Sequence, residues 1–366
     1  MRPRLLMVCT LPPPVHGSAM VSQYIQDSQL INEEFDMDFV NLSTSRTIDE
    51  IGKSSSILLL KKIGRFLSAY FKCFRLLLTY RYALCYCAIT CHGIGFLKDA
   101  PFVLLCKLFG RKVVIHQHNK GMKKCVNKWP YRWLLPLVYR NTKVILLSWY
   151  LYDDISTVVS RDQILICPNG VPEITNNVDH LERNNPVPRL LFLSNLIESK
   201  GVYILLDACK ILKDKGFEFV CDFVGGETKK ITHEIFEEEV RKRGLDGEIS
   251  YWGQKYGEAK EHFWNMCDVF VQPTFEDCFP LTIIEAMQHH LPVISTAEGA
   301  IRDMVKDGKN GFICERNDVG SLVDTLEKLI TQPLLRKTMG KKSYEIYKND
   351  FTLETFEKRI LTLLQS

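Results

Sequence analysis

Acidic residues gather around a predicted helix start in the segment PTFEDCFPLTIIEAMQHHLPVIST, residues 273–296. Pro280 suits the first turn of a helix, where its missing N–H costs no hydrogen bond. The next backbone amides would then point outward as an anion site, because the amino end of a helix carries partial positive charge. Glu276 and Asp277 precede this helix and Glu285 lies within it. Such acids are about as often helix caps or surface charges as functional groups, so the segment allows an anion site without requiring one.

A lysine and an asparagine follow another predicted strand, in FLSNLIESKG at residues 192–201. The ammonium group of Lys200 could stabilise negative charge that develops on a bound anionic group. A lone lysine before a helix is more often a solvated charge, so the setting of Lys200 decides between the two. Asn195 could donate a hydrogen bond there but brings no charge.

Two histidines end the predicted strand in VVIHQHNKG, residues 113–121, on one side of it. The pair could bind a metal, but no third ligand of fitting spacing is evident. An imidazole at this strand end could instead hydrogen-bond a substrate or support charge at a reacting carbon. In LPPPVHGSAMV, residues 11–21, Gly17 with Ser18 allows close approach of a phosphate or acceptor, although a lone glycine more often makes a turn.

Short apolar, β-rich runs that alternate with helical patterns must position these residues. The predicted helices include 19–31, 57–80, 97–109, 128–141 and a last one at 352–364, and a turn-rich linker covers 168–188. Repeated units of this kind predict parallel sheets covered on both faces, with ligands at the carboxyl ends of the strands. The predicted strands are Arg4–Thr10, Met37–Leu42, Ala83–Thr90, Lys112–His116, Lys143–Leu147, Gln163–Cys167, Arg189–Leu193, Glu218–Val224, Glu248–Trp252, Val269–Gln272 and Pro292–Ser295.

Length and composition are those of an ordinary folded chain. At 366 residues two domains are expected, and 46% hydrophobic residues exclude a wholly disordered chain. Thirteen scattered cysteines without a CxxC pair favour small buried thiols in a reducing cytosol. The N-terminal MRPRLLMVCTLPPP is expected to be a strand and not a signal peptide. No apolar run approaches the roughly 18–20 residues that span a bilayer.

The charge of the chain is small but unevenly distributed. The formal net charge of +4 argues against a dedicated nucleic-acid binder, yet Lys53 to Lys143 holds 18 basic residues and a single acid, Asp99. The predicted helix in this stretch also carries an apolar stripe, which by itself could simply face the core. The charge excess predicts more, namely attraction to an anionic membrane surface. The stripe consists of Phe66, Tyr70, Phe71, Phe74, Leu77 and Leu78.

The segment 273–296 closely resembles the nucleotide-sugar loop of retaining glycosyltransferases of family 4, the glycosyl transferases group 1, which have the GT-B fold. That family shows a Glu, seven residues, a second Glu, then Ala-Met and a Pro-Val-Ile strand. Asp277 and Glu285 stand in this register. The resemblance implies that the first acid binds sugar hydroxyls and the second binds the ribose. Whether Glu276 or Asp277 is the sugar-binding acid stays open.

Other motifs follow in the order of the family. Lys200 matches the lysine that grips the diphosphate, while Asn195 stands where an arginine is usual. The family register favours His118 over His116, which is expected at the buried end of the strand, and it places Gly17 and Ser18 opposite the donor diphosphate. The catalytic residues implied are His118, Lys200, Asp277 and Glu285. The substrate-binding residues implied are Gly17, Ser18, Asn195, Gly225, Glu276, Cys278, Phe279, Pro280, Leu281 and Thr282.

The resemblance implies an α/β protein of GT-B fold, with two Rossmann-like βαβ domains facing across a cleft. Residues 1–182 would bind the acceptor and 183–350 the nucleotide sugar, and a helix at 351–366 could cross back to the first domain. The expected enzyme is a retaining hexosyltransferase that uses neither metal nor cofactor. It would act on a glycan or polyprenyl-linked acceptor in bacterial-type cell-surface polysaccharide synthesis.

Two alternatives stay open beside this expectation. One is a nucleotide-sugar 2-epimerase of the same architecture, and the other is a catalytically silent scaffold that binds carbohydrate or membrane. The expected location is cytoplasmic, peripheral on the inner face of the membrane, with no nucleic-acid partner.

Overall fold

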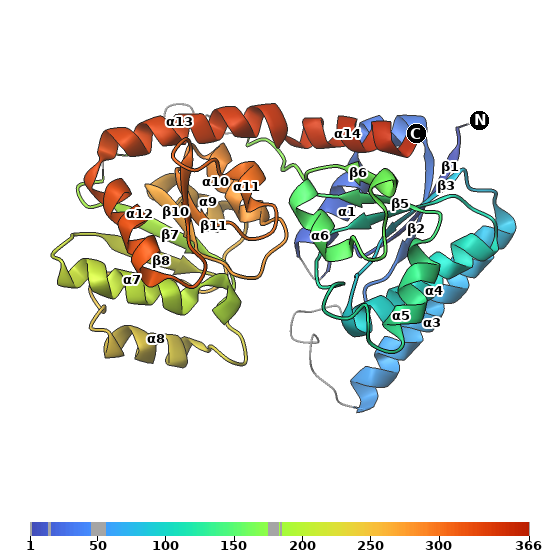
Figure 1. Cartoon of the computed structure of the whole chain (residues 1–366), viewed down its shortest axis with the longest axis horizontal. Coiled ribbons are helices and arrows are strands. Elements are labelled where there is room, and N and C mark those ends of the chain that lie inside the picture. The colour runs from blue at the N-terminus through green and yellow to red at the C-terminus, as the bar shows by residue number, and fades with distance from the viewer. Residues whose placement is uncertain (1, 14–15, 45–55, 175–182, 184, 366) are drawn as a thin grey trace. The chain divides into compact units, whose positions relative to one another are not determined.

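The computed structural model describes residues 2–13, 16–44, 56–174, 183 and 185–365. Lys53, where the basic stretch begins, and residues 175–182 and 184 of the predicted linker lie outside these residues. The chain divides into two compact units (Figure 1). One is Met1–Gly170 together with Leu353–Ser366, and the other is Val171–Thr352. The predicted boundary at 182/183 adjoins residues outside the described part and stays a prediction.

The first unit contains a six-stranded, all-parallel sheet of order β2-β1-β3-β4-β5-β6. Its central strands are almost wholly buried, as expected where helices cover both faces of a parallel sheet. The strands are β1 Arg4–Cys9, β2 Asp36–Asn41, β3 Leu84–Ala88, β4 Val113–Gln117, β5 Lys143–Leu146 and β6 Ile164–Ile166.

The helices of the first unit include the last helix of the chain. Phe356, Ile360 and Leu364 lie on one face of that helix, α14, and pack into the core that β1 and β4 share. The predicted helix 19–31 is divided at Ser28, which caps α2 by accepting a hydrogen bond from the Ile31 amide. The helices are α1 Gly17–Asp27, α2 Gln29–Glu34, α3 Ser56–Thr79, α4 Gly93–Leu108, α5 Tyr131–Tyr139, α6 Tyr152–Ile155 and α14 Leu353–Gln365, with short 3-10 turns η2 Trp149–Leu151 and η3 Arg161–Gln163.

The second unit repeats the architecture with a parallel sheet of order β12-β11-β10-β7-β8-β9. Its edge strand β12 is absent from the predicted strands, because a four-residue segment that begins with glycine carries little strand signal. The strands are β7 Arg189–Leu193, β8 Val220–Val224, β9 Ile249–Tyr251, β10 Val269–Gln272, β11 Val293–Thr296 and β12 Gly311–Cys314.

Helices connect the strands of the second unit. Amphipathic α7 packs on the sheet through buried side chains such as Leu205, Leu206 and Leu212. The helices are η5 Glu198–Lys200, α7 Val202–Asp214, α8 His233–Lys242, α9 Gly257–Met266, α10 Leu281–Gln288, α11 Ile301–Met304, α12 Val319–Thr331 and α13 Pro333–Asp350.

The burial of the cysteines and the apolar length of the helices can be compared with the sequence-based expectations on the described residues. Each of the thirteen cysteines is a buried free thiol, which confirms the predicted burial. Among the described residues, no helix combines the length and apolar character that a bilayer crossing requires.

Candidate functional site

The loop between β10 and α10 ends at Pro280, which precedes the helix and is not in its first turn. Pro280 has extended backbone (φ −68°, ψ 116°), and α10 begins at Leu281. The predicted helix start was therefore one residue too early. The fixed φ of proline suits the position just before the helix as well as its first turn. The amides of Leu281 and Thr282 therefore open the helix, where no preceding turn supplies carbonyl partners.

An ion pair joins two of the predicted catalytic residues. Lys200 Nζ lies 2.5 Å from Asp277 Oδ2 and donates to the Glu276 carbonyl at 3.2 Å. The other oxygen of Asp277 accepts from the Cys278 amide at 2.8 Å. The side chains of Lys200 and Asp277 are only 21% and 15% exposed, whereas Glu276 is exposed. A cation and a carboxylate thus share one partly shielded position just before α10.

Close backbone packing brings these two loops together. Gly201 has φ +90°, and a Cβ there would lie 2.4 Å from the Pro273 carbonyl oxygen. The Ser199 carbonyl accepts from the Phe275 amide at 2.9 Å and from the Thr274 hydroxyl at 3.0 Å. Only glycine fits between the loops, which places Lys200 beside Asp277.

Asn195 connects the ends of two neighbouring strands. Its Oδ1 accepts a hydrogen bond from the Gly226 amide at 2.9 Å. Gly225 has φ +157°, and a Cβ there would lie 1.9 Å from the Ser194 carbonyl oxygen. In this structure the predicted substrate-binding Asn195 and Gly225 therefore hold the β7 and β8 loops against each other.

Glu285 is paired with a lysine that the sequence analysis did not single out. Lys260 Nζ, on α9, contacts both carboxylate oxygens of Glu285, at 2.6 and 2.7 Å. The two residues are 25 positions apart and no motif contains Lys260, so no local signal could have found it. The packing of α9 beside α10 alone creates the pair.

The remaining predicted residues of this loop are mostly packed inside it. Cys278 and Phe279 are 9% and 6% exposed, which leaves little side-chain surface for a ligand. The Cys278 carbonyl accepts from the Ala300 amide at 2.8 Å, and Gly299 (φ +54°) lies against the Asp277 carbonyl. Thr282 Oγ1 donates to Gln272 Oε1 at 2.9 Å.

In the first unit, His118 follows β4 and lies over His116, with ring centroids 4.1 Å apart. His116 is fully buried and its Nδ1 lies 2.7 Å from the Tyr86 hydroxyl, as expected for the buried end of the strand. Both ring nitrogens of His118 are buried and have no hydrogen-bond partner among the described residues. Burial, together with the nearby His16, lowers the pKa of His118 to about 3, so its imidazole is neutral near pH 7.

Gly17 and Ser18 open α1 in the same unit. His16 caps this helix, since its Nδ1 accepts from the Ala19 amide at 3.3 Å and lies 3.1 Å from Ser18 Oγ. Burial lowers the pKa of His16 as well, and Lys98 lowers it further. His16 is a neighbour of the predicted residues that the sequence analysis missed, because histidine is not among the residue types that usually cap a helix start.

The predicted site residues thus form two groups, one in each unit. His118, Gly17 and Ser18 belong to the first unit, and all others belong to the second. Within the second unit the structure joins Lys200 with Asp277 and Asn195 with the glycine turn, while Glu285 pairs elsewhere. The described residues include no cluster of three or more His, Cys, Asp or Glu side chains that could hold a metal. The expected independence from metal stays a prediction.

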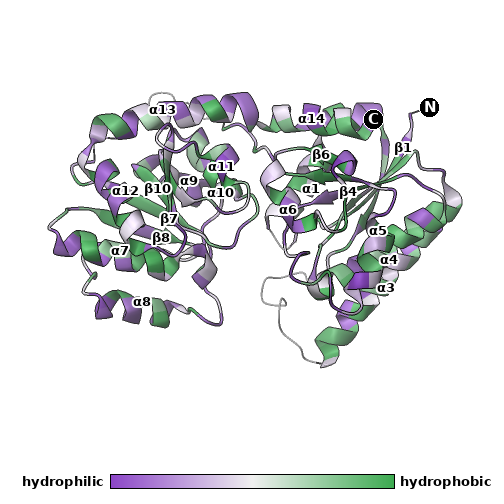
Figure 2. Ribbon diagram, in the orientation of Figure 1, coloured by the Kyte–Doolittle hydropathy of each residue, from purple (hydrophilic) through white to green (hydrophobic). Residues whose placement is uncertain are grey.

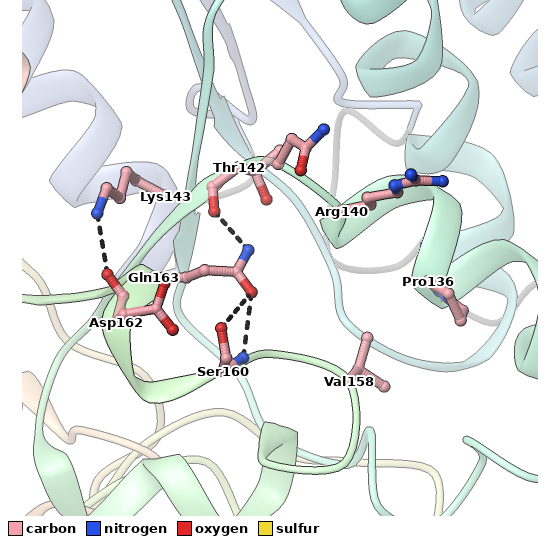
Figure 3. A pocket seen from close by; sticks show the side chains of 9 residues that line it. Pro136, Arg140, Thr142, Lys143, Val158, Ser160, Asp162 and Gln163 are labelled. Atoms are coloured by element: carbon pink, nitrogen blue, oxygen red, sulfur yellow. Dashed lines mark hydrogen bonds between the residues drawn. The ribbon is translucent and has the colours of Figure 1, made fainter.

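A separate pocket of about 570 Å³ lies at the amino ends of β5 and β6 (Figure 3). Its Gln163 donates to the Thr142 carbonyl at 2.7 Å, and Lys143 donates to the Asp162 carbonyl at 2.9 Å. These bonds tie the pocket wall to the backbone. The amino ends of parallel strands are opposite the edge where open α/β sheets bind ligands, and no predicted site residue lines this pocket.

The second half of the chain matches a known protein family. Residues 173–346 match the family described as Glycosyl transferases group 1. An uncharacterized glycosyltransferase of Methanocaldococcus jannaschii is 31% identical over 208 residues, which cover 57% of this chain and 55% of that protein. The capsular polysaccharide biosynthesis glycosyltransferase CapM of Staphylococcus aureus is 28% identical over 162 residues, or 44% of this chain and 41% of CapM. The chain therefore aligns with about half the length of these curated relatives.

Solved structures match along the whole chain. Sucrose-phosphate synthase from Thermosynechococcus elongatus superimposes with a TM-score of 0.77 at 16% identity, covering 100% of this chain and 98% of that one. Anabaena HepE in complex with UDP-glucose gives 0.74 at 15% identity, covering 99% of both chains. Identities this low show the fold alone. The two parallel six-stranded sheets and these neighbours confirm the expected α/β GT-B fold with two Rossmann-like domains, and the match to the glycosyl transferases group 1 family covers residues 173–346.

Proposed function

We propose that this chain is a retaining glycosyltransferase that moves a hexose from a nucleotide-diphosphate-sugar to a hydroxyl of a glycan or lipid-linked acceptor. The observation that carries the proposal is the Lys200–Asp277 pair immediately before α10, inside the group 1 domain. The position combines a cation, a helix start and a carboxylate, which suit a diphosphate joined to a hydroxyl-rich sugar. Assignment to family 4, retention and independence from metal are part of the proposal.

The roles of the second-unit residues follow from charge. The leaving nucleoside diphosphate gains negative charge, and the Lys200 ammonium and the first amides of α10 stabilise it. Asp277 accepts hydrogen bonds from sugar hydroxyls once Lys200 turns toward the phosphates, and the exposed Glu276 is the alternative for this role. Glu285, oriented by Lys260, accepts from the ribose hydroxyls.

The first unit supplies the acceptor side and the histidine. A neutral His118 can donate one hydrogen bond to the donor sugar or support charge at the reacting carbon without itself carrying charge. Gly17 and Ser18, at the start of α1, allow backbone approach to the diphosphate. Retention would follow from front-face attack or a short-lived oxocarbenium ion.

The relatives support the setting of the reaction. CapM is named for capsular polysaccharide biosynthesis, and WcaL of Escherichia coli is named as a putative colanic acid biosynthesis glycosyltransferase. By analogy we assign this chain to bacterial-type cell-surface polysaccharide synthesis. In this proposal it works in the cytoplasm at the inner face of the membrane.

A donor panel tests the proposal. The purified full chain is given UDP-, GDP- and dTDP-hexoses with and without a lipid-linked acceptor, and the products are followed by NMR. Donor consumption that requires acceptor and keeps the anomeric configuration supports transfer with retention. Isomerised donor without acceptor would support the epimerase, inverted product would refute retention, and no turnover would support the scaffold.

Matched variants test the site. We expect Lys200→Ala and Glu285→Gln to lose activity. The control variants Lys210→Ala and Glu327→Gln should keep it, because Lys210 pairs with Asp214 and Glu327 with Lys215 in surface contacts of α7 and α12. Full activity of both site variants would refute the assignment.

A further inference from the structure

The helix α3 presents an apolar stripe that the described part of the chain leaves exposed. Its members recur at spacings of three and four, so they share one side of the helix. Their exposed fractions range from 40% to 69%, far above those of core residues. The stripe consists of Leu60, Ile63, Leu67, Phe71, Phe74 and Leu78.

Another side of α3 packs against the rest of the first unit. The rings of Phe66 and Tyr70 each lie 5.6 Å from the ring of Phe102 on α4, and Cys73 and Leu77 are buried. The stripe predicted from sequence therefore divides in two. Phe66, Tyr70 and Leu77 face the protein, whereas Phe71 and Leu78 are largely exposed. Phe74 lies between the two sets, because its ring contacts Phe109 at 5.8 Å while 40% of the residue stays exposed.

Basic residues lie beside the exposed stripe. Lys61, Lys72 and Arg75 are exposed, and helical periodicity places them on the adjacent strip of the α3 surface. Figure 2 shows hydrophobic and hydrophilic residues side by side along this helix. No acidic residue occurs in α3. The surface thus combines an apolar stripe with a positive border.

Exposed aromatic and apolar side chains also occur on α5. Trp133 and Leu137 are 62% and 55% exposed, and the Arg132 guanidinium lies 5.2 Å from the Trp133 ring. Both α3 and α5 pack against α4 (Figure 1). Exposed tryptophan beside arginine is typical of side chains that rest at a membrane interface.

We infer that the exposed face of α3 docks in the plane of an anionic lipid bilayer, with the apolar stripe in the headgroup–acyl boundary and Lys61, Lys72 and Arg75 on lipid phosphates. An amphipathic helix with an apolar face and a basic border has the chemistry that such a surface binds. A nucleic acid offers phosphates, and bases that stack on aromatic rings, but it has no apolar phase that would bury the aliphatic side chains Leu60, Ile63, Leu67 and Leu78. The inference deepens the proposed function by naming the surface that brings the enzyme to a lipid-linked acceptor.

Vesicle sedimentation tests the inference. The full chain is mixed with phosphatidylcholine vesicles that contain either no anionic lipid or about one third phosphatidylglycerol. We expect binding to the anionic vesicles, weakened by salt. The double variant Phe71→Ser/Leu78→Ser and the triple variant Lys61→Glu/Lys72→Glu/Arg75→Glu should each lower the partition coefficient at least about tenfold.

Matched variants in the second unit serve as controls. Leu334→Ser/Ile235→Ser removes exposed apolar residues, and Lys309→Glu/Lys337→Glu/Lys341→Glu makes the same change in net charge. Both should bind vesicles as the unaltered chain does, and circular dichroism should show all variants folded. Equal loss in the controls and the α3 variants would overturn the inference, as would equal binding to neutral and anionic vesicles.

A second copy of the chain is the rival occupant of the apolar stripe. A dimer in light scattering that Phe71→Ser/Leu78→Ser abolishes, without vesicle binding by the unaltered chain, would overturn the inference. The binding assay contains no nucleotide sugar, so its failure is distinct from failure of the donor panel. Retained transfer to a soluble acceptor by the α3 variants would support a docking role.

Discussion

Lys260 on α9 holds both carboxylate oxygens of Glu285 on α10, at 2.6 and 2.7 Å. The two side chains are 22% and 25% exposed, so the pair is only partly shielded from solvent. This contact orients the carboxylate that we assign to the ribose, and Lys260 is therefore a positioning residue for the donor.

Replacement of Lys260 tests this orientation. We expect Lys260→Ala to raise the KM for the nucleotide sugar roughly two- to fivefold, the range that a partly exposed ion pair supports, with little change in kcat. Steady-state kinetics with varied donor measure both constants, and Lys260→Arg should restore part of the loss. A fall in kcat at unchanged KM would contradict the positioning role.

The Lys200–Asp277 pair predicts a larger effect on chemistry. Removing the cation in Lys200→Met should lower kcat about a hundredfold, as loss of one group that stabilises developing charge does. Asp277→Asn should weaken donor binding because the amide offers one acceptor oxygen in place of a carboxylate. Single-turnover measurements separate the two effects. A Glu276→Gln variant with the larger loss would show that Glu276, and not Asp277, is the sugar-binding acid.

The lowered pKa of His118 predicts a pH dependence of stability. An unfolded histidine takes up a proton near its usual pKa of about 6.5, while folded His118 stays neutral down to about pH 3. Between these pH values the unfolded state therefore binds more protons than the folded state. The contribution of His118 to the free energy of unfolding is fully present above about pH 6.5 and is lost as the pH falls toward 3. Urea unfolding at several pH values should show a shallower decline for His118→Gln. An unchanged pH profile would count against this account of His118.

The glycine turn after β8 predicts a strong local effect on folding. A Cβ on Gly225 would lie 1.9 Å from the Ser194 carbonyl oxygen, and its φ of +157° is one that other residues rarely adopt. We expect Gly225→Ala to lower the free energy of unfolding by about 3 kcal/mol or more, through strain and backbone displacement. Gly247→Ala is the matched control, because nothing lies within 4 Å of its added Cβ. Equal urea midpoints for both variants would refute the close approach.

Much of the fold was readable from local patterns. Apolar runs such as residues 5–9 and 113–115 mark strands buried on both faces, and their alternation with helical patterns specifies a parallel α/β chain. The same logic placed Lys200, Asp277 and His118 in loops or turns after strands. It missed β12, since a short edge strand carries few apolar residues.

The sequence by itself determined the α/β class, the twofold βα plan and the segments that carry the chemistry, because each depends on residues close together in the chain. Only the tertiary structure decided which distant residues meet. It assigned α14 to the first unit through Phe356 and Ile360, paired Lys260 with Glu285, and turned Asn195 toward Gly226. It also showed which side of α3 the described residues cover and which they leave exposed. Such contacts join elements far apart in the chain, and they form only when the sheets and helices have packed.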